Sequence, residues 1–317
     1  MAQKKIELAT TTSITTTYAG QFAGQYIAAA LLSGSTIDNG GIEVKPNIKY
    51  KEVIKKGATD ANIIKDATCD FTATGTLTLT ERILQPEEFQ VNLELCKKDF
   101  RSDWEAVQMG YSAYDNLPRK FSDFIIGHVA GLVAEKTEEN IWSGVNATAG
   151  EFDGFVTLAT ADADVVDVVG TTVTSANVIA ELGKIVDAIP SALYGKEDEY
   201  IYISQNIARA YVRALGGFGA SGLGAAGTNS MGTQWWNNGS LSFDGVKLFV
   251  ANGLADDTAM AAQKSNLYFG TGLLSDLNEV KVLDMADLDG SENVRVIMRM
   301  TAGVQYAFAG DVVTYGI

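Results

Sequence analysis

Few residues in this chain could carry out chemistry. His128 is the only histidine, and Cys69 and Cys96 are the only cysteines. A zinc site needs several His or Cys ligands at short spacing, and a serine hydrolase needs a G-x-S-x-G turn, which the sequence lacks. His128 falls on the apolar face of a predicted helix, where a histidine satisfied in the core or at an interface is expected. The sequence therefore predicts no catalytic residue and no metal site.

Two glycine patterns match the fingerprint that binds a dinucleotide. Gly217–Gly222 fits G-x-G-x-x-G, and Gly222–Gly227 fits it again. In a dinucleotide-binding fold a strand precedes these glycines and a helix begins within them. Here the preceding segment, Gln205–Leu215, has the pattern of a helix, so the order is reversed. We interpret residues 216–232, of which seven are glycine, as a flexible loop and predict no cofactor.

An aspartate-rich segment near the C-terminal end resembles the middle of a calcium loop. Asp287-Leu288-Asp289-Gly290 would place Gly290 at the sixth position of an EF-hand. Met285 would then occupy the first ligand position and Val296 the twelfth, and neither side chain binds calcium. A hairpin turn rich in Asp is the better interpretation.

The overall charge excludes one large class of function. The 317 residues contain 24 Lys and Arg against 39 Asp and Glu, a formal net charge of −15. A general nucleic-acid binder needs a surplus of positive charge to neutralise phosphates. With 46% hydrophobic residues the chain has enough apolar surface to fold. No apolar run reaches the roughly 20 residues that span a bilayer, so no membrane segment is predicted.

The N-terminal third lacks the pattern of a compact domain. Ala9–Thr17 is polar and β-branched with no period that defines a buried face, which predicts an extended arm. From Ile42 to Leu95 the sequence alternates, with turn signals at Lys55–Gly57 and Thr59-Asp60. This pattern predicts a long β-hairpin that is polar on both faces.

The hairpin segment also concentrates positive charge. Between Val44 and Lys65 there are six lysines against two acidic residues, while Leu254–Glu292 has eight acidic residues against two lysines. A run of charge is usually a solvated face. The sharper hypothesis is that the lysines dock on the acidic body of a neighbouring copy. The predicted inter-subunit contact residues are Lys45, Lys49, Lys51, Lys55, Lys56, Asp284, Asp287 and Asp289.

A long helix and an α/β region are predicted for the rest. Pro118 suits the first turn of a helix that continues to about Trp142, and a short apolar strand follows Phe155. Beyond about Gly170 the expected helices are Thr174–Ile189 and Gln205–Leu215. The expected strands are Tyr200–Ile203, Val246–Val250, Asn266–Phe269, Glu279–Leu283, Val294–Thr301 and Gln305–Thr314.

This order of parts resembles the major capsid protein of tailed phages with the Hong Kong 97-type fold. The resemblance is one of layout over nearly the whole chain, without a short invariant motif. It is carried by Met1–Ser33, Ile42–Leu95, Pro118–Trp142, Thr174–Ile189 and Tyr200–Leu215. It implies an α+β fold with an N-terminal arm (residues 1–35), an E-loop hairpin (36–100), a peripheral domain with a spine helix (101–172 and 284–317) and an axial α/β domain (173–283).

The resemblance also implies a function. Copies of the chain would assemble in the host cytoplasm, through pentamers and hexamers, into the icosahedral shell of a virion that encloses double-stranded DNA without sequence-specific binding. A portal and a scaffolding protein would be further partners, and the resemblance leaves open whether decoration proteins bind. Gly219, Gly222 and Gly224 would let the axial loop adapt to five-fold and six-fold positions. Trp235 and Trp236, beside that loop, are either buried core or a contact between copies.

Three alternatives remain open from the sequence. An encapsulin-like compartment shell shares the fold and differs in its cargo. A soluble α/β nucleotide-binding enzyme would use Gly217–Gly227, but it would gain nothing from an arm and a hairpin that have no core of their own. A tail-tube protein would be dominated by sheet and would lack the long helix.

Overall fold

The computed structural model describes residues 35–59, 64–67, 69, 75–96, 119–215, 241–272, 281–286 and 290–317. The described residues belong to two compact units. One takes in those of 92–126 and 281–297, and the other those of 30–91, 127–280 and 298–317. The predicted arm therefore falls almost entirely outside the described residues. None of the described helices is long and apolar enough to cross a bilayer.

A six-stranded sheet forms the centre of the larger unit. Its strand order is β5-β13-β9-β6-β8-β7, with parallel pairing of β5 with β13 and of β6 with β8. The bounds are β5 Val166–Val168, β13 Val313–Tyr315, β9 Ala259–Gln263, β6 Glu199–Ile203, β8 Val246–Val250 and β7 Ser242–Phe243. β5 and β13 come from outside residues 173–283, so the sheet is completed by segments on both sides of the predicted axial domain. That division into domains stays a prediction.

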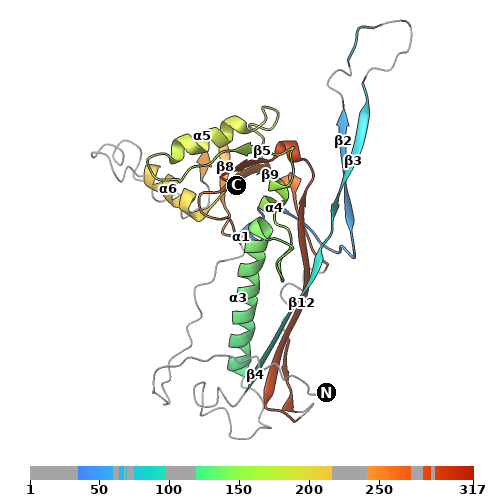
Figure 1. The fold of residues 1–317 in the computed structure, drawn as a ribbon, viewed down its shortest axis with the longest axis vertical. Coiled ribbons are helices and arrows are strands. Elements are labelled where there is room, and N and C mark those ends of the chain that lie inside the picture. Colours follow the sequence, from blue (N-terminus) through green and yellow to red (C-terminus); the bar gives the residue numbers. More distant parts are fainter. Residues whose placement is uncertain are drawn as a thin grey trace. The chain divides into compact units, whose positions relative to one another are not determined.

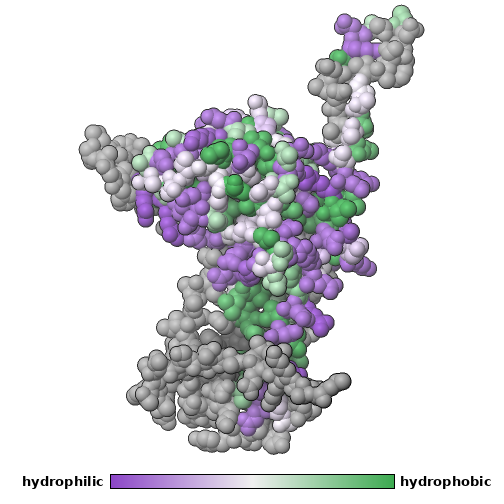
Figure 2. Space-filling model, in the orientation of Figure 1, coloured by the Kyte–Doolittle hydropathy of each residue, from purple (hydrophilic) through white to green (hydrophobic). Residues whose placement is uncertain are grey.

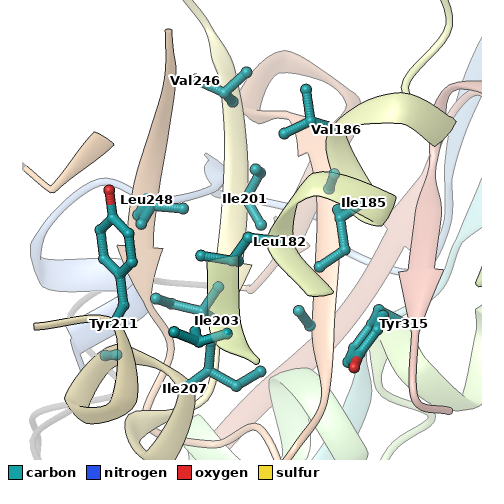
Figure 3. Close-up of a cluster of buried hydrophobic side chains, with 14 of the residues drawn as sticks. Leu182, Ile185, Val186, Ile201, Ile203, Ile207, Tyr211, Val246, Leu248 and Tyr315 are labelled. Atoms are coloured by element: carbon teal, nitrogen blue, oxygen red, sulfur yellow. The ribbon is translucent and has the colours of Figure 1, made fainter. Parts of the chain in front are cut away.

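Two helices, α5 (Val178–Ala188) and α6 (Gln205–Leu215), cover one face of this sheet. Side chains on a strand alternate between its two faces, so Ile201 and Ile203 of β6 point toward the helices while Tyr202 faces the other way. Figure 3 shows the resulting cluster, in which the labelled side chains come from α5, α6 and the sheet. The labelled residues are Leu182, Ile185, Val186, Ile201, Ile203, Ile207, Tyr211, Val246, Leu248 and Tyr315.

A second sheet has five strands, with order β1-β10-β12-β11 and β4 paired to β12. The bounds are β1 Glu43–Lys45, β10 Leu267–Gly270, β12 Asn293–Tyr306, β11 Lys281–Asp284 and β4 Glu87–Cys96. β12 pairs with β10 through Gly303–Tyr306 and with β11 through Val294–Ile297. The sequence predicted two strands in place of β12 and part of β13. The ladder instead continues through Ala302-Gly303, where a Cβ on Gly303 would lie 3.0 Å from the carbonyl oxygen of Gln85.

The long helix α3 (Arg119–Ser143) confirms the predicted helix. Its last turns pack against α4 (Phe155–Thr160), where the sequence predicted a strand. The prediction was wrong because Phe155 and Ala159, four residues apart, are both buried on one side of a helical turn. Further short elements are the helix α1 (Ser35–Asp38) and the 3₁₀ turns η2 (Lys264–Asn266) and η4 (Ala309–Asp311).

The end of α3 requires glycine in the chain around it. A Cβ on Gly253 would lie 2.1 Å from the carbonyl oxygen of Glu138, and one on Gly154 would lie 2.6 Å from that of Asn140. Real Cβ atoms do not approach that closely, so both backbones can contact the helix only through glycine.

The start of α5 also differs from the prediction. The helix begins at Val178, because the segment from Thr174 to Asn177 forms a turn closed by its own side chains. Asn177 Oδ1 accepts hydrogen bonds from the Thr174 backbone N–H at 2.6 Å and from Thr174 Oγ1 at 3.0 Å. Thr174 thus stabilises a turn before the helix rather than capping the helix itself.

Candidate subunit-contact surface

Among the described strands, β2 (Glu52–Thr59) and β3 (Leu77–Leu84) pair only with each other, as a two-stranded antiparallel sheet (Figure 1). The ladder is continuous from Glu52 opposite Leu84 to Thr59 opposite Leu77. The turn predicted at Lys55–Gly57 is therefore wrong. The two lysines are adjacent residues of an extended strand, and extended backbone sends them to opposite faces.

One face of this hairpin carries exposed apolar side chains on both sides of a Lys55–Glu81 pair. The register places Val53 opposite Ile83 and Gly57 opposite Leu79, with Leu77 two residues further along the same face. The exposed fractions are 43% for Val53, 46% for Ile83, 74% for Leu79 and 65% for Leu77. Figure 2 shows green, hydrophobic side chains on this part of the hairpin. We call Val53, Gly57, Leu77, Leu79 and Ile83 the apolar hairpin face.

The sequence predicted a hairpin that is polar on both faces, and the apolar hairpin face contradicts that description. The alternation of Leu77 and Leu79 is visible in the sequence, but their alignment with Val53 requires the register of the two strands. Lys55 and Glu81 lie opposite each other in the middle of this face and are both exposed. Opposite charges directly across two strands attract each other, so the Lys55–Glu81 pair supports this register.

The other face of the hairpin anchors it at its base. Ile54 and Leu84 are buried in a small cluster with Ile48 and Ala307. Arg82 makes an ion pair with Asp162 and lies over the ring of Tyr306, 4.5 Å from its centroid.

The same contacts shift the pKa values of Tyr306 and Asp162. Burial raises the pKa of Tyr306 to about 12, and its hydroxyl donates to Asp162 Oδ2 at 3.0 Å. The hydrogen bond from Arg82 is the main cause that lowers the pKa of Asp162. The base of the hairpin is thus held to the rest of its unit by apolar packing and by the Arg82–Asp162 ion pair.

The predicted lysines divide into two groups. Lys45 pairs with Glu52 of its own chain at 2.7 Å and lies 4.6 Å from the centroid of the Tyr268 ring. Lys56 lies 5.2 Å from the centroid of Phe308. These contacts orient both side chains within the chain. Lys49, Lys51 and Lys55 are exposed, with Lys51 over the ring of Tyr50.

The predicted acidic partners are only partly described. Asp284 ends β11 half-buried, and its Oδ1 accepts the backbone N–H of Ala286 at 3.0 Å. The rest of the predicted site lies outside the described residues: Asp287, Asp289, Gly219, Gly222, Gly224, Trp235 and Trp236. The inter-subunit roles of all these residues stay predictions. Among the residues that the structure describes, no group of three or more His, Cys, Asp or Glu side chains is arranged to hold a metal ion.

Comparison with known proteins identifies the fold. No family model and no curated protein matches the chain. Among solved structures, the capsid of a native GTA particle is 11% identical with a TM-score of 0.60, over 92% of this chain and 93% of that chain. The capsid of Myoviridae phage XM1 is 11% identical with a TM-score of 0.59, over 92% and 94%.

A structure from Mycobacterium phage Adephagia is 14% identical with a TM-score of 0.59, over 91% of each chain. At such identities the likeness shows a common fold. The predicted α+β fold of the Hong Kong 97 type is thereby confirmed.

Proposed function

We propose that this chain is the structural subunit of a tailed-phage capsid, and that its copies assemble into a closed shell. The observation that carries the proposal is the apolar hairpin face, exposed on two strands that have no other partner in the described part of the chain. The proposal is supported by the fold, because the solved capsids that it resembles cover more than nine tenths of this chain. The role is structural, and the proposal includes no catalytic step.

The apolar hairpin face favours a protein partner on energetic grounds. Fully burying a leucine or valine side chain is worth about 1.5–3 kcal/mol relative to leaving it exposed. Leu77 and Leu79 keep most of their surface in water in the single chain. A neighbouring copy that covers them would gain that free energy at every contact in the shell.

In more detail, the proposal is that the copies form pentamers and hexamers, that these build an icosahedral shell, and that the shell encloses double-stranded DNA. The net charge of −15 supports the last point. A strongly acidic shell repels the phosphate backbone, so DNA could be packed inside without binding to the inner surface of the shell. A portal and a scaffolding protein are the further partners that such a shell requires.

Purified chain, with scaffolding protein if needed, is expected to form large closed particles or capsomer rings. The reason is that burial of the apolar hairpin face requires a second copy. Light scattering and negative-stain microscopy would measure the outcome, and the contents of the particles would distinguish DNA from protein cargo. A chain that stays folded and strictly monomeric at high concentration would contradict the proposal.

Reversing the charge of Lys49 and Lys51 to Glu is expected to reduce or misdirect assembly while the single chain stays folded. These two lysines are exposed and lie outside the apolar hairpin face, and they are proposed to face acidic residues of a neighbour. Each exposed pair is worth only about 0–1 kcal/mol, but the change converts attraction to repulsion and every copy repeats it. Particle yield and circular dichroism would be measured together.

The matched control replaces the same two lysines with Arg, which keeps the charge at each position. This control should assemble at the wild-type yield. A wild-type yield from the Glu variant would remove the electrostatic part of the proposal, and the role of the apolar hairpin face would stand independently.

A further inference from the structure

Glu199 is a buried carboxyl group without a hydrogen-bond partner. It is the first residue of β6, opposite Gln263 of β9, and only 2% of its surface is exposed. Neither of its carboxyl oxygens has a hydrogen-bond partner among the residues that the structure describes. An ionised carboxylate in such a place is costly, because neither water nor a donor compensates for its lost hydration.

The charged groups around Glu199 are mostly negative. Asp198, the preceding residue, and Asp311, from η4, both act on it with negative charge, while Lys196 is the opposing cation. Asp198 is itself held in place, since its oxygens accept hydrogen bonds from Gln263 Nε2 at 3.1 Å and Ser265 Oγ at 2.7 Å. Burial, and then these two acids, raise the pKa of Glu199 to about 7.

Glu199 lies where a charge would affect the pairing of strands at one end of the six-stranded sheet. β9 pairs with β6 on one side, where Glu199 lies opposite Gln263, and with β13 on the other, where Ala261 lies opposite Val313. η4 leads directly into β13. The elements that contribute the charges around Glu199 therefore converge on one end of the six-stranded sheet.

We propose that the protonation state of Glu199 controls local opening at this end of the sheet. The ends of β6 and β9 stay paired when the carboxyl group is protonated and open more readily when it is ionised. Ionisation in place would leave a buried, unpaired charge beside two other acids. Local opening of the ends of β6 and β9 lets water reach the carboxylate and relieves that cost. The device acts within one chain, so it is independent of the proposed shell function and is tested on unassembled protein.

The sign of the pH dependence follows from the raised pKa. The folded state binds this proton more tightly than the unfolded state, whose glutamate has the ordinary value of 4.5. The stabilisation by the proton is complete below about pH 4.5 and is lost as the pH rises through about 7. Between about pH 4.5 and about pH 7 the opening equilibrium should increase by up to about tenfold per pH unit, and above about pH 7 it should level off because the carboxyl group is then ionised in both states.

Hydrogen exchange of the unassembled chain tests the proposal between about pH 5 and about pH 8.5, after correction for the intrinsic pH dependence of exchange. Protection of the amides of β6 and β9 in the wild-type chain should fall as the pH rises from about 5 to about 7 and should then level off. In Glu199→Gln the protection should not change with pH. Glu197→Gln, which changes an exposed residue in the preceding turn, is the matched control and should behave like wild type.

A second variant tests the neighbouring charge. Asp311→Asn removes one of the two acids that oppose ionisation, so the transition should move to lower pH. A wild-type chain with no transition near pH 7, or a Glu199→Gln chain with the same transition as wild type, would overturn the proposal.

Infrared difference spectroscopy of the wild-type chain provides a readout that needs no variant to fold. A protonated carboxyl group absorbs apart from carboxylates, and one such group should be lost as the pH rises through about 7. Loss of every protonated carboxyl at the ordinary pH of glutamate would overturn the proposal.

Discussion

Replacing Leu77 and Leu79 together with serine is expected to abolish the formation of closed particles. Both side chains are more than half exposed in the single chain, so the change removes little intrachain packing. At a covered contact it removes two leucines, each worth about 1.5–3 kcal/mol when fully buried. Because about 1.4 kcal/mol corresponds to a tenfold change in affinity, each contact should weaken by about a hundredfold or more. Microscopy would measure particle yield, and circular dichroism would report folding.

The matched control uses the opposite face of the same strand. Thr78→Ala with Thr80→Ala changes the alternate positions of β3, which lie across from Ala58 and Lys56. This control should retain most of the particle yield. Equal loss of particles in both variants would assign the effect to the strand as a whole, and normal assembly of the serine variant would contradict a role for the apolar hairpin face.

Trp142→Ala is expected to lower the free energy of unfolding by about 3–5 kcal/mol, the usual cost of truncating a large buried aromatic side chain. Trp142 is fully buried at the end of α3, with ring centroids 5.6 Å from Phe155 and 5.0 Å from Tyr202. Its Nε1 donates to Thr36 Oγ1 at 2.9 Å. Thr36 in turn donates to the buried carboxylate of Glu138. The variant therefore leaves a cavity and removes a donor from a buried polar group.

Denaturant unfolding would measure the change. Tyr50→Ala serves as the control, because Tyr50 is 69% exposed and its truncation should stay within about 0.5 kcal/mol. Trp142→Phe should fall between the two, since it keeps much of the apolar volume and loses the hydrogen bond. A loss below about 1 kcal/mol for Trp142→Ala would show that the centre of the core lies elsewhere.

The elements that the sequence located correctly have local signals of their own. α3, α6, β6 and β8 all have bounds within one residue of the predicted ones. α6 has its apolar side chains on one buried stripe, whereas β6 and β8 are short runs of mostly aromatic and aliphatic residues. α3 begins directly after Pro118, the residue that predicted its start. Local pattern was enough because these signals lie within each element or next to it.

The missed elements depend on neighbours that are distant in sequence. β9 has the sequence Ala-Met-Ala-Ala-Gln, which has little β-propensity, yet it lies between β6 and β13 with four of its five residues buried. Small side chains fit there because helices and strands cover both faces of the sheet. No local pattern in residues 259–263 reveals that environment.

The candidate surface was missed for a related reason. The excess of lysine in the hairpin segment suggested a charged contact, but Lys45 and Lys56 have partners within the chain. The apolar hairpin face becomes visible only when β2 and β3 are aligned, because Val53 and Ile83 are 30 positions apart in the sequence and directly opposite in the ladder. Register is a property of the pair of strands, and neither strand encodes it alone.

The place of β13 in the six-stranded sheet determines when this protein can fold during synthesis. β13 lies between β5 and β9, and Thr314 Oγ1 bonds to Asp167 Oδ1 across 147 positions of sequence. A ribosome adds about 5–20 residues per second. β5 and β9 must therefore wait for many seconds, each with an unpaired edge, until residues 313–315 emerge. A nascent chain that stops short of them should stay open to chaperones and proteases, so that truncated products are removed before they can be built into anything larger.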